Sequence, residues 1–205
     1  SIINGDEEDD NVVNTEKTYE VVNVYEFVQA IKSLIGNING TSGDDIINGT
    51  SGDDIINGYA GNDTVEGGLG DDILIGGDGI DTISYATSSQ AVSIDLSLTN
   101  SQDTLGAGID TITGFENITG SNYDDTLKGN NLSNIIIGGL GNDIITGGLA
   151  DDILNGEDGI DTVSYQSSTA GVTVNLATAT AQNTIGAGTD TLTNFENLID
   201  RKSVV

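Results

Sequence analysis

Aliphatic residues recur along this chain about every nine positions, and a Gly- or Asn-rich stretch precedes most of them. Three residues centred on each aliphatic form a minimal strand with one apolar face, and glycine or asparagine can take the positive φ of a tight turn. The pattern predicts an all-β fold, a flattened solenoid of short parallel strands in which two nonapeptides make one coil. The aliphatic positions are Ile46, Ile55, Val65, Leu74, Ile83, Leu127, Ile136, Ile145, Leu154 and Val163.

Two places before each of these aliphatics lies an aspartate or, once, an asparagine. The resulting repeat is G-G-x-G-x-D-x-U-x, where U is aliphatic. Its first series is unevenly spaced at one step, between Asp53 and Asp63, and its second is evenly spaced throughout. The predicted metal-ligating residues are Asp44, Asp53, Asp63, Asp72, Asp81, Asp125, Asn134, Asp143, Asp152 and Asp161.

A longer period overlies the short one, because Tyr85, Leu96 and Asp110 recur at the same mutual spacing as Tyr165, Leu176 and Asp190. The chain therefore reads as a tandem duplication, each copy being five nonapeptides followed by a connecting β segment. We expect an acidic and capping segment over 1–36, a first β-roll over 37–119 and a second over 120–205. The two rolls are expected to form one continuous solenoid, and we expect the whole to be a monomeric segment of a larger protein.

Composition removes many functions. Five Lys plus Arg against 33 Asp plus Glu give a net charge of −28, which argues against nucleic acid or an anionic membrane as partner. Without His and Cys, no His-based triad, zinc–thiolate site or disulfide can form. No apolar run is long enough to cross a bilayer. We expect no enzymatic activity, since only paired carboxylates outside the repeats would support catalysis.

The charge needs a counterion. Turns one coil apart stack about 4.8 Å from each other, and at an effective dielectric near 20 two carboxylates at that spacing repel by roughly 3 to 4 kcal/mol. Calcium–oxygen distances of about 2.3 to 2.6 Å fit between such turns, whereas magnesium at about 2.05 Å fits less well. We expect roughly six Ca²⁺ ions, between the pairs Asp44–Asp63, Asp53–Asp72, Asp63–Asp81, Asp125–Asp143, Asn134–Asp152 and Asp143–Asp161. Asn134 brings no charge, so its site should be weaker.

These repeats, cleanest as Gly67-Gly68-Leu69-Gly70-Asp71-Asp72, resemble the RTX (repeats-in-toxin) family and, beyond the repeats, the repeat regions of RTX adhesins and haemolysin-like surface proteins. The resemblance implies right-handed parallel β-rolls that bind calcium, export by type I secretion machinery, and a secreted or cell-surface location. The segment then serves as a spacer or secretion-assisting module. The alternative is the C-terminal module of a secreted lipase or protease whose catalytic domain is not in this chain.

Several residues stand apart from the repeat. Apolar positions from Val24 to Ile35 follow helical spacing and predict a short helix that caps the solenoid, with a partner-binding helix as the alternative. Asp110, Asp190 and Glu116 partly fit the motif, but no clear partner lies two nonapeptides away, so they stay outside the predicted set. Tyr85 and Tyr165 are interpreted as packing at the end of each array.

Overall fold

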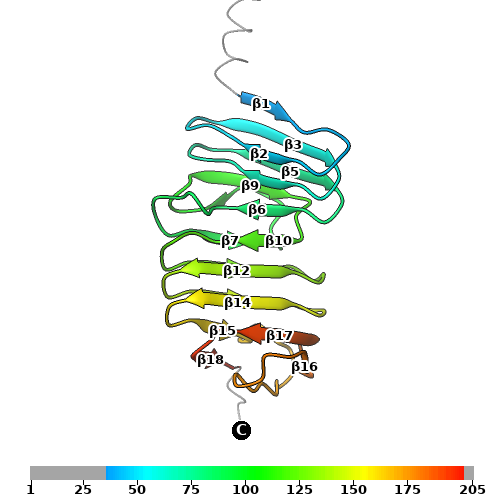
Figure 1. Cartoon of the computed structure of the whole chain (residues 1–205), viewed down its shortest axis with the longest axis vertical. Helices are drawn as coiled ribbons and strands as arrows, with labels where there is room; N and C mark the ends of the chain where they lie inside the picture. Colours follow the sequence, from blue (N-terminus) through cyan, green and yellow to red (C-terminus); the bar gives the residue numbers. More distant parts are fainter. Residues whose placement is uncertain (1–35, 201–205) are drawn as a thin grey trace, which may run out of the picture.

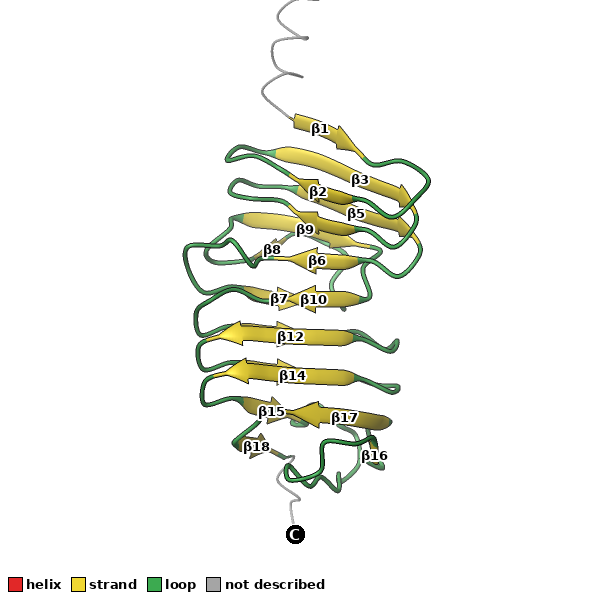
Figure 2. Cartoon of the chain, viewed as in Figure 1, coloured by secondary structure: helices red, strands yellow, loops and turns green. Residues whose placement is uncertain are grey.

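The computed structural model describes residues 36–200, and every regular element in that range is a strand. The strands lie across the long axis of an elongated stack (Figure 1; Figure 2). This confirms the predicted all-β class. The bounds are β1 Gly36–Asn39, β2 Ile46–Asn48, β3 Asp54–Ala60, β4 Thr64–Glu66, β5 Ile73–Asp78, β6 Thr82–Ser84, β7 Ser93–Asp95, β8 Gln102–Asp103, β9 Ile109–Thr113, β10 Asn117–Thr119, β11 Thr126–Lys128, β12 Ile135–Leu140, β13 Ile144–Thr146, β14 Ile153–Asp158, β15 Thr162–Ser164, β16 Gln182–Asn183, β17 Thr189–Thr193 and β18 Asn197–Ile199.

Within the nonapeptide arrays, from β1 to β6 and from β10 to β15, consecutive strands alternate between sheets, as a two-strand coil requires. One eight-stranded sheet runs through both arrays in the order β16-β17-β14-β12-β10-β6-β4-β2. Two five-stranded sheets hold the intervening strands, in the orders β1-β3-β5-β9-β8 and β18-β15-β13-β11-β7. Pairing is parallel except where β8 meets β9 and β16 meets β17. The parallel stacking predicted from the repeat is confirmed.

The core is a narrow column of aliphatic side chains, one from each of the strands β2–β6 and β10–β15. Val65 pairs with Ile83, Leu74 lies beneath Ile56, and Ile136 lies beside Leu154 in the same register, all of them fully buried. Residues on either side of each aliphatic point outwards, because side chains alternate along a strand. This packing stacks the coils and fixes where each turn lies.

The predicted register is wrong by one position in the first two repeats. Ile46 is 81% exposed and Ile47 is 6% exposed, and Ile56 rather than Ile55 is fully buried. Both repeats read Asp-Asp-Ile-Ile, so either isoleucine satisfies the local pattern. Register with the next coil decides between them, because Ile47 pairs with Val65 and Ile56 with Leu74.

Each connecting segment widens one coil without leaving the solenoid. β7 joins the sheet beside β11, and β8 folds back on β9. Leu74 consequently pairs with Ile112 instead of with a residue two nonapeptides further on. In the second copy Val172, Val174 and Leu176 pack against the core from a segment that is not a strand.

Two further expectations are not tested by these residues. The predicted capping helix lies before residue 36, outside the described part of the chain. The right-handed winding also stays a prediction. Residues 36–200 contain no helix that could cross a membrane.

Candidate calcium ladder

The turns bring one carboxylate per repeat into a buried line, and each carboxylate bonds to the backbone of the coil before it. Asp63 Oδ1 accepts the amide N–H of Asp45 at 2.8 Å, and Asp81 Oδ1 accepts that of Asp63 at 2.8 Å. On the other side of the solenoid, Asp72 Oδ1 accepts the amide of Asp54 at 2.8 Å. Successive partners are 18 residues apart, the length of one coil.

We call these lines of side chains the ladder. In the first array Asp63 and Asp81 are neighbours in successive coils, and in the second array so are Asp125–Asp143, Asn134–Asp152 and Asp143–Asp161. One side of the solenoid carries Asp45, Asp63, Asp81, Glu116, Asn134, Asp152 and Asp190; the other carries Asp54, Asp72 and Asp110, then Asp125, Asp143, Asp161 and Glu196.

Asp44 and Asp53 do not lie in the ladder; their neighbours Asp45 and Asp54 do. Asp44 and Asp53 are exposed, and their Oδ1 atoms accept the amides of Asn62 at 2.7 Å and Asp71 at 2.9 Å on the outside of the turns. The expected pairs Asp44–Asp63 and Asp53–Asp72 are therefore corrected to Asp45–Asp63 and Asp54–Asp72. The uneven step in the first series was the signal, since Asp45 and Asp54 make the spacing up to Asp63 even.

The ladder also includes four carboxylates that the sequence prediction left out. Asp110 Oδ1 accepts the amide of Asp72 at 3.0 Å across 38 residues, and Glu116 Oε2 accepts that of Asp81 at 2.9 Å across 35. Asp190 and Glu196 repeat these bonds with Asp152 and Asp161. A search for partners two nonapeptides earlier misses them, because the connecting segment lengthens the coil; Glu116 does have Asn134 eighteen residues later. Their recurrence in both copies of the duplication was the available signal.

The second carboxylate oxygen of many ladder residues is buried without any hydrogen-bond partner. Among the described residues this holds for Oδ2 of Asp63, Asp72, Asp81, Asp143, Asp152 and Asp161, and for Oδ1 of Asp54. Each of these residues is at most 1% exposed. A buried carboxylate oxygen without a partner is costly, so these seven oxygens are candidate ligands for a cation.

At the ten ladder residues that lie in the nonapeptide repeats, a glycine five places earlier leaves room for that oxygen. A Cβ on Gly67 would lie 2.5 Å from Asp72 Oδ2, and one on Gly76 would lie 2.8 Å from Asp81 Oδ2. At Gly58 the same position faces both Asp63 Oδ2 and the Gly76 carbonyl oxygen of the next coil. The space beside each carboxylate is therefore lined by carboxylate and backbone carbonyl oxygens, the ligands that calcium takes.

Gly67→Ala tests this space. The added methyl group must displace the Asp72 carboxylate, so we expect a loss of about 1 to 3 kcal/mol in stability with calcium present and a higher calcium concentration at half-saturation. Urea unfolding and calcium titration measure the two effects. Gly52→Ala is the matched control, since its Cβ meets nothing within 4 Å and should change stability by no more than about 1 kcal/mol. Equal effects of the two substitutions would contradict the predicted role of Gly67.

Burial raises the pKa of several ladder carboxylates. Burial, aided by the neighbouring charges of Asp110, Asp54 and Asp53, raises the pKa of Asp72 to about 7. Burial and neighbouring carboxylates likewise raise the pKa of Asp143 and that of Asp152 to about 7. Protonation at this pH removes the repulsion that a cation would otherwise have to offset.

The one basic residue among positions 36–200 forms its ion pair outside the ladder. Lys128 Nζ lies 2.7 Å from Asp95 Oδ2 at the partly exposed end of β7. Burial alone would raise the pKa of Asp95, but the bonds from Lys128 and Ser97 outweigh it and lower that pKa. Twenty-five of the 33 acidic residues lie in the same range. Their counterions must come from solution.

The geometry does not supply a complete metal site from side chains. Within residues 36–200, no three acidic side chains gather closely enough to hold an ion by themselves. An ion in the ladder would therefore also use turn carbonyls. Three hollows in the surface each contain one carboxylate, Glu66, Asp124 or Glu116. None of these three offers the carboxylate pair that glycoside hydrolysis needs.

A parallel solenoid with buried carboxylates at its turns defines a calcium-binding repeat protein. The family model of the RTX calcium-binding nonapeptide repeat matches the chain in four copies, over residues 39–74, 48–83, 113–131 and 129–163. The chain belongs to this RTX nonapeptide-repeat family. Comparison with curated proteins gave no match. The resemblance inferred from the repeats is thus confirmed, and the third copy includes Glu116, which the sequence prediction left out.

Proposed function

We propose that this chain is a calcium-dependent structural module of a secreted bacterial protein, folding when it binds calcium outside the cell. The observation that carries the proposal is the row of buried carboxylate oxygens without partners. Bound calcium would supply positive charge between the coils, and the ladder carboxylates and turn carbonyls would hold it.

Low calcium inside the cell would leave the ladder uncompensated, and millimolar calcium outside would neutralise it. Thin packing supports this coupling, because each short strand contributes one buried aliphatic to the core. From the resemblance to the family, we extend the proposal to export by type I secretion. The chain would then serve as a spacer or secretion-assisting segment.

Calorimetric titration of the EDTA-treated, dialysed chain tests the proposal. We expect calcium to bind several ions per chain, with a half-saturation concentration at least tenfold lower than that of magnesium. The reason is geometric: coils about 4.8 Å apart accommodate calcium–oxygen bonds but are too widely spaced for magnesium. If injections of calcium give only the heat of dilution, the proposal is wrong. If calcium and magnesium bind with equal affinity, the geometric argument is wrong.

A further inference from the structure

Ladder positions differ in the residue that lies four places before the carboxylate. At six positions this residue has a left-handed backbone: Tyr59, Gly68, Gly77, Gly139, Gly148 and Glu157, with φ between 70° and 120°. The carboxylates that follow them are Asp63, Asp72, Asp81, Asp143, Asp152 and Asp161, the six whose Oδ2 lacks a partner. We call these the open positions.

At two of the open positions, the amide of the left-handed residue donates to a side chain other than the ladder carboxylate. Tyr59 N–H donates to Asn57 Oδ1 at 3.0 Å, and Glu157 N–H donates to Asn155 Oδ1 at 3.1 Å. The left-handed residue at the other four open positions is glycine, which has no side chain that could donate a hydrogen bond to the carboxylate. The Oδ2 atom of an open position is thereby left to face the turn without a donor.

At a second group of positions, the chain itself donates hydrogen bonds to the second oxygen of the ladder residue. We call such a position closed. Thr50 donates its amide to Asp54 Oδ2 at 2.6 Å and its hydroxyl to the same atom at 2.9 Å. Thr41 makes the same two bonds to Asp45 Oδ2, at 2.6 and 2.9 Å. None of the four residues whose backbone amides donate to the ladder residue four places later (Thr41, Thr50, Ser121, Asn130) has a positive φ.

The first two positions of the second array are also closed by hydrogen bonds from the chain. Ser121 donates its amide to Asp125 Oδ2 and its hydroxyl to Asp125 Oδ1, at 2.5 and 2.8 Å. Asn134 is satisfied on both sides, since its Oδ1 accepts the amide of Asn130 at 2.9 Å and its Nδ2 donates to the Glu116 carbonyl at 2.5 Å. Its amide group thus occupies the space that a cation would take.

Tyrosine and threonine close the far end of each array. Asp110 Oδ2 accepts the hydroxyls of Tyr85 at 3.1 Å and Thr104 at 2.9 Å. Asp190 Oδ2 accepts those of Tyr165 at 2.8 Å and Thr184 at 3.3 Å. We call these two, with Asp45, Asp54, Asp125 and Asn134, the capped positions. The interpretation of the two tyrosines as packing thus acquires a polar role as well.

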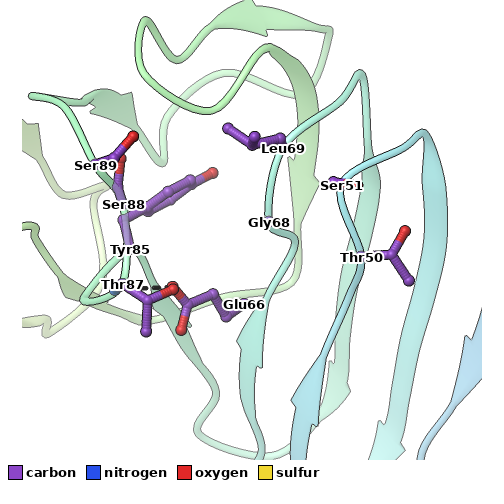
Figure 3. Close-up of a pocket in the computed structure, with 9 residues that line it drawn as sticks. All are labelled: Thr50, Ser51, Glu66, Gly68, Leu69, Tyr85, Thr87, Ser88 and Ser89. Atoms are coloured by element: carbon purple, nitrogen blue, oxygen red, sulfur yellow. Dashed lines mark hydrogen bonds between the residues drawn. The ribbon is translucent and has the colours of Figure 1, made fainter.

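Open and capped positions meet side by side. Figure 3 shows Thr50 and Gly68 in neighbouring coils; they precede the capped Asp54 and the open Asp72 by four places each. Asp72 in turn bonds to the amide of Asp54. Asp54 has a free oxygen too, but it is Oδ1, the atom that elsewhere in the ladder accepts an amide from the preceding coil. Its Oδ2 is closed.

We propose that calcium is confined to the six open positions, three per array, and that the capped positions are held by the chain's own hydroxyl and amide donors. This rests on the proposed function as a calcium-binding module. An ion at a capped position would have to displace two charge-assisted hydrogen bonds that already satisfy the carboxylate. Within the nonapeptide repeats, the residue four places before each ladder residue thereby decides where calcium binds.

Asp143→Asn and Asp125→Asn test this assignment on adjacent residues of one ladder. Calorimetric titration of the wild-type chain should give about six ions, one for each open Oδ2. We expect Asp143→Asn to lose about one ion and Asp125→Asn to lose none. Asp63→Asn, the equivalent substitution in the first copy, should match Asp143→Asn. An equal loss at Asp125 and Asp143 would overturn the assignment.

Thr50→Gly and Thr50→Ser give a second test that needs no change to a carboxylate. Glycine removes the hydroxyl and permits a positive φ, so it should open Asp54 and add about one ion. Serine keeps the cap and should leave the stoichiometry unchanged. No gain with glycine would contradict the assignment. A wild-type chain that binds no calcium would overturn the proposed function itself, whereas calcium binding that depends equally on capped and open positions would overturn only the assignment.

Discussion

In EDTA near neutral pH, the chain is expected to give a far-UV circular dichroism spectrum of an unfolded polypeptide, and millimolar calcium is expected to restore the β signal. Neighbouring carboxylates about 4.8 Å apart repel by roughly 3 to 4 kcal/mol each at an effective dielectric near 20. Several such pairs exceed the free energy of roughly 5 to 15 kcal/mol that separates the folded from the unfolded state of a typical domain. Calcium reverses the sign of this interaction at every open position.

Sodium chloride at matched ionic strength is the control for this experiment. Salt screens exposed charges but acts much less on buried ones, so it should restore little of the β signal. Magnesium should be less effective than calcium at the same concentration. A spectrum that is already β-rich in EDTA and does not change with calcium would contradict calcium-dependent folding.

Protons should stabilise the calcium-free fold as well, so its stability is expected to rise as the pH falls from about 7 towards 4. Asp72, Asp143 and Asp152 have pKa values raised from 3.8 to about 7 by burial and neighbouring charges. Between these values the folded chain binds more protons than the unfolded chain. Stability then rises by roughly 1.4 kcal/mol per pH unit for each extra proton bound, and the gain ends below the unfolded pKa.

The far-UV circular dichroism signal in EDTA from pH 7 to pH 4 measures this effect as recovery of the β signal, and thermal unfolding at the acid end, where the chain is folded, gives a Tm that rises as the pH falls. With calcium in excess the trend should reverse, because protons then compete with calcium for the same carboxylates. The double variant with Asp72→Asn and Asp143→Asn removes two of the titrating groups and should flatten the rise in EDTA. A Tm that falls steadily with acid in EDTA would contradict the assignment of raised pKa values to the ladder.

The repeat could be recognised from sequence because its chemistry is local. An aliphatic at every ninth position needs only a strand and a turn to explain it, and an acid in fixed phase with that aliphatic has no reason to recur unless the turns share a ligand. Asp63, Asp72 and Asp81 are accordingly found in the ladder, as are their counterparts in the second array.

Local pattern could not resolve two neighbouring acids before two neighbouring isoleucines. Asp44 and Asp45 are equivalent until the coil stacks on the next one, and burial of Ile47 against Val65 then selects Asp45. Nor could it pair Asp110 with Asp72 or Glu116 with Asp81, which lie 38 and 35 residues earlier across the connecting segment. Stacking sets both outcomes, because a parallel sheet fixes register between residues far apart in sequence.

The sequence by itself determined that this protein is an all-β repeat of the calcium-binding RTX type, and its negative charge is the basis for predicting calcium-dependent folding. Which carboxylate oxygens lack a hydrogen-bond partner was decided only by the tertiary structure. Thr50 and Gly68 hold the same place in their repeats, yet one donates two hydrogen bonds to its carboxylate and the other donates none. That difference depends on backbone conformation and on the position of the side chain in the stacked turn, which the spacing of residues along the chain does not specify.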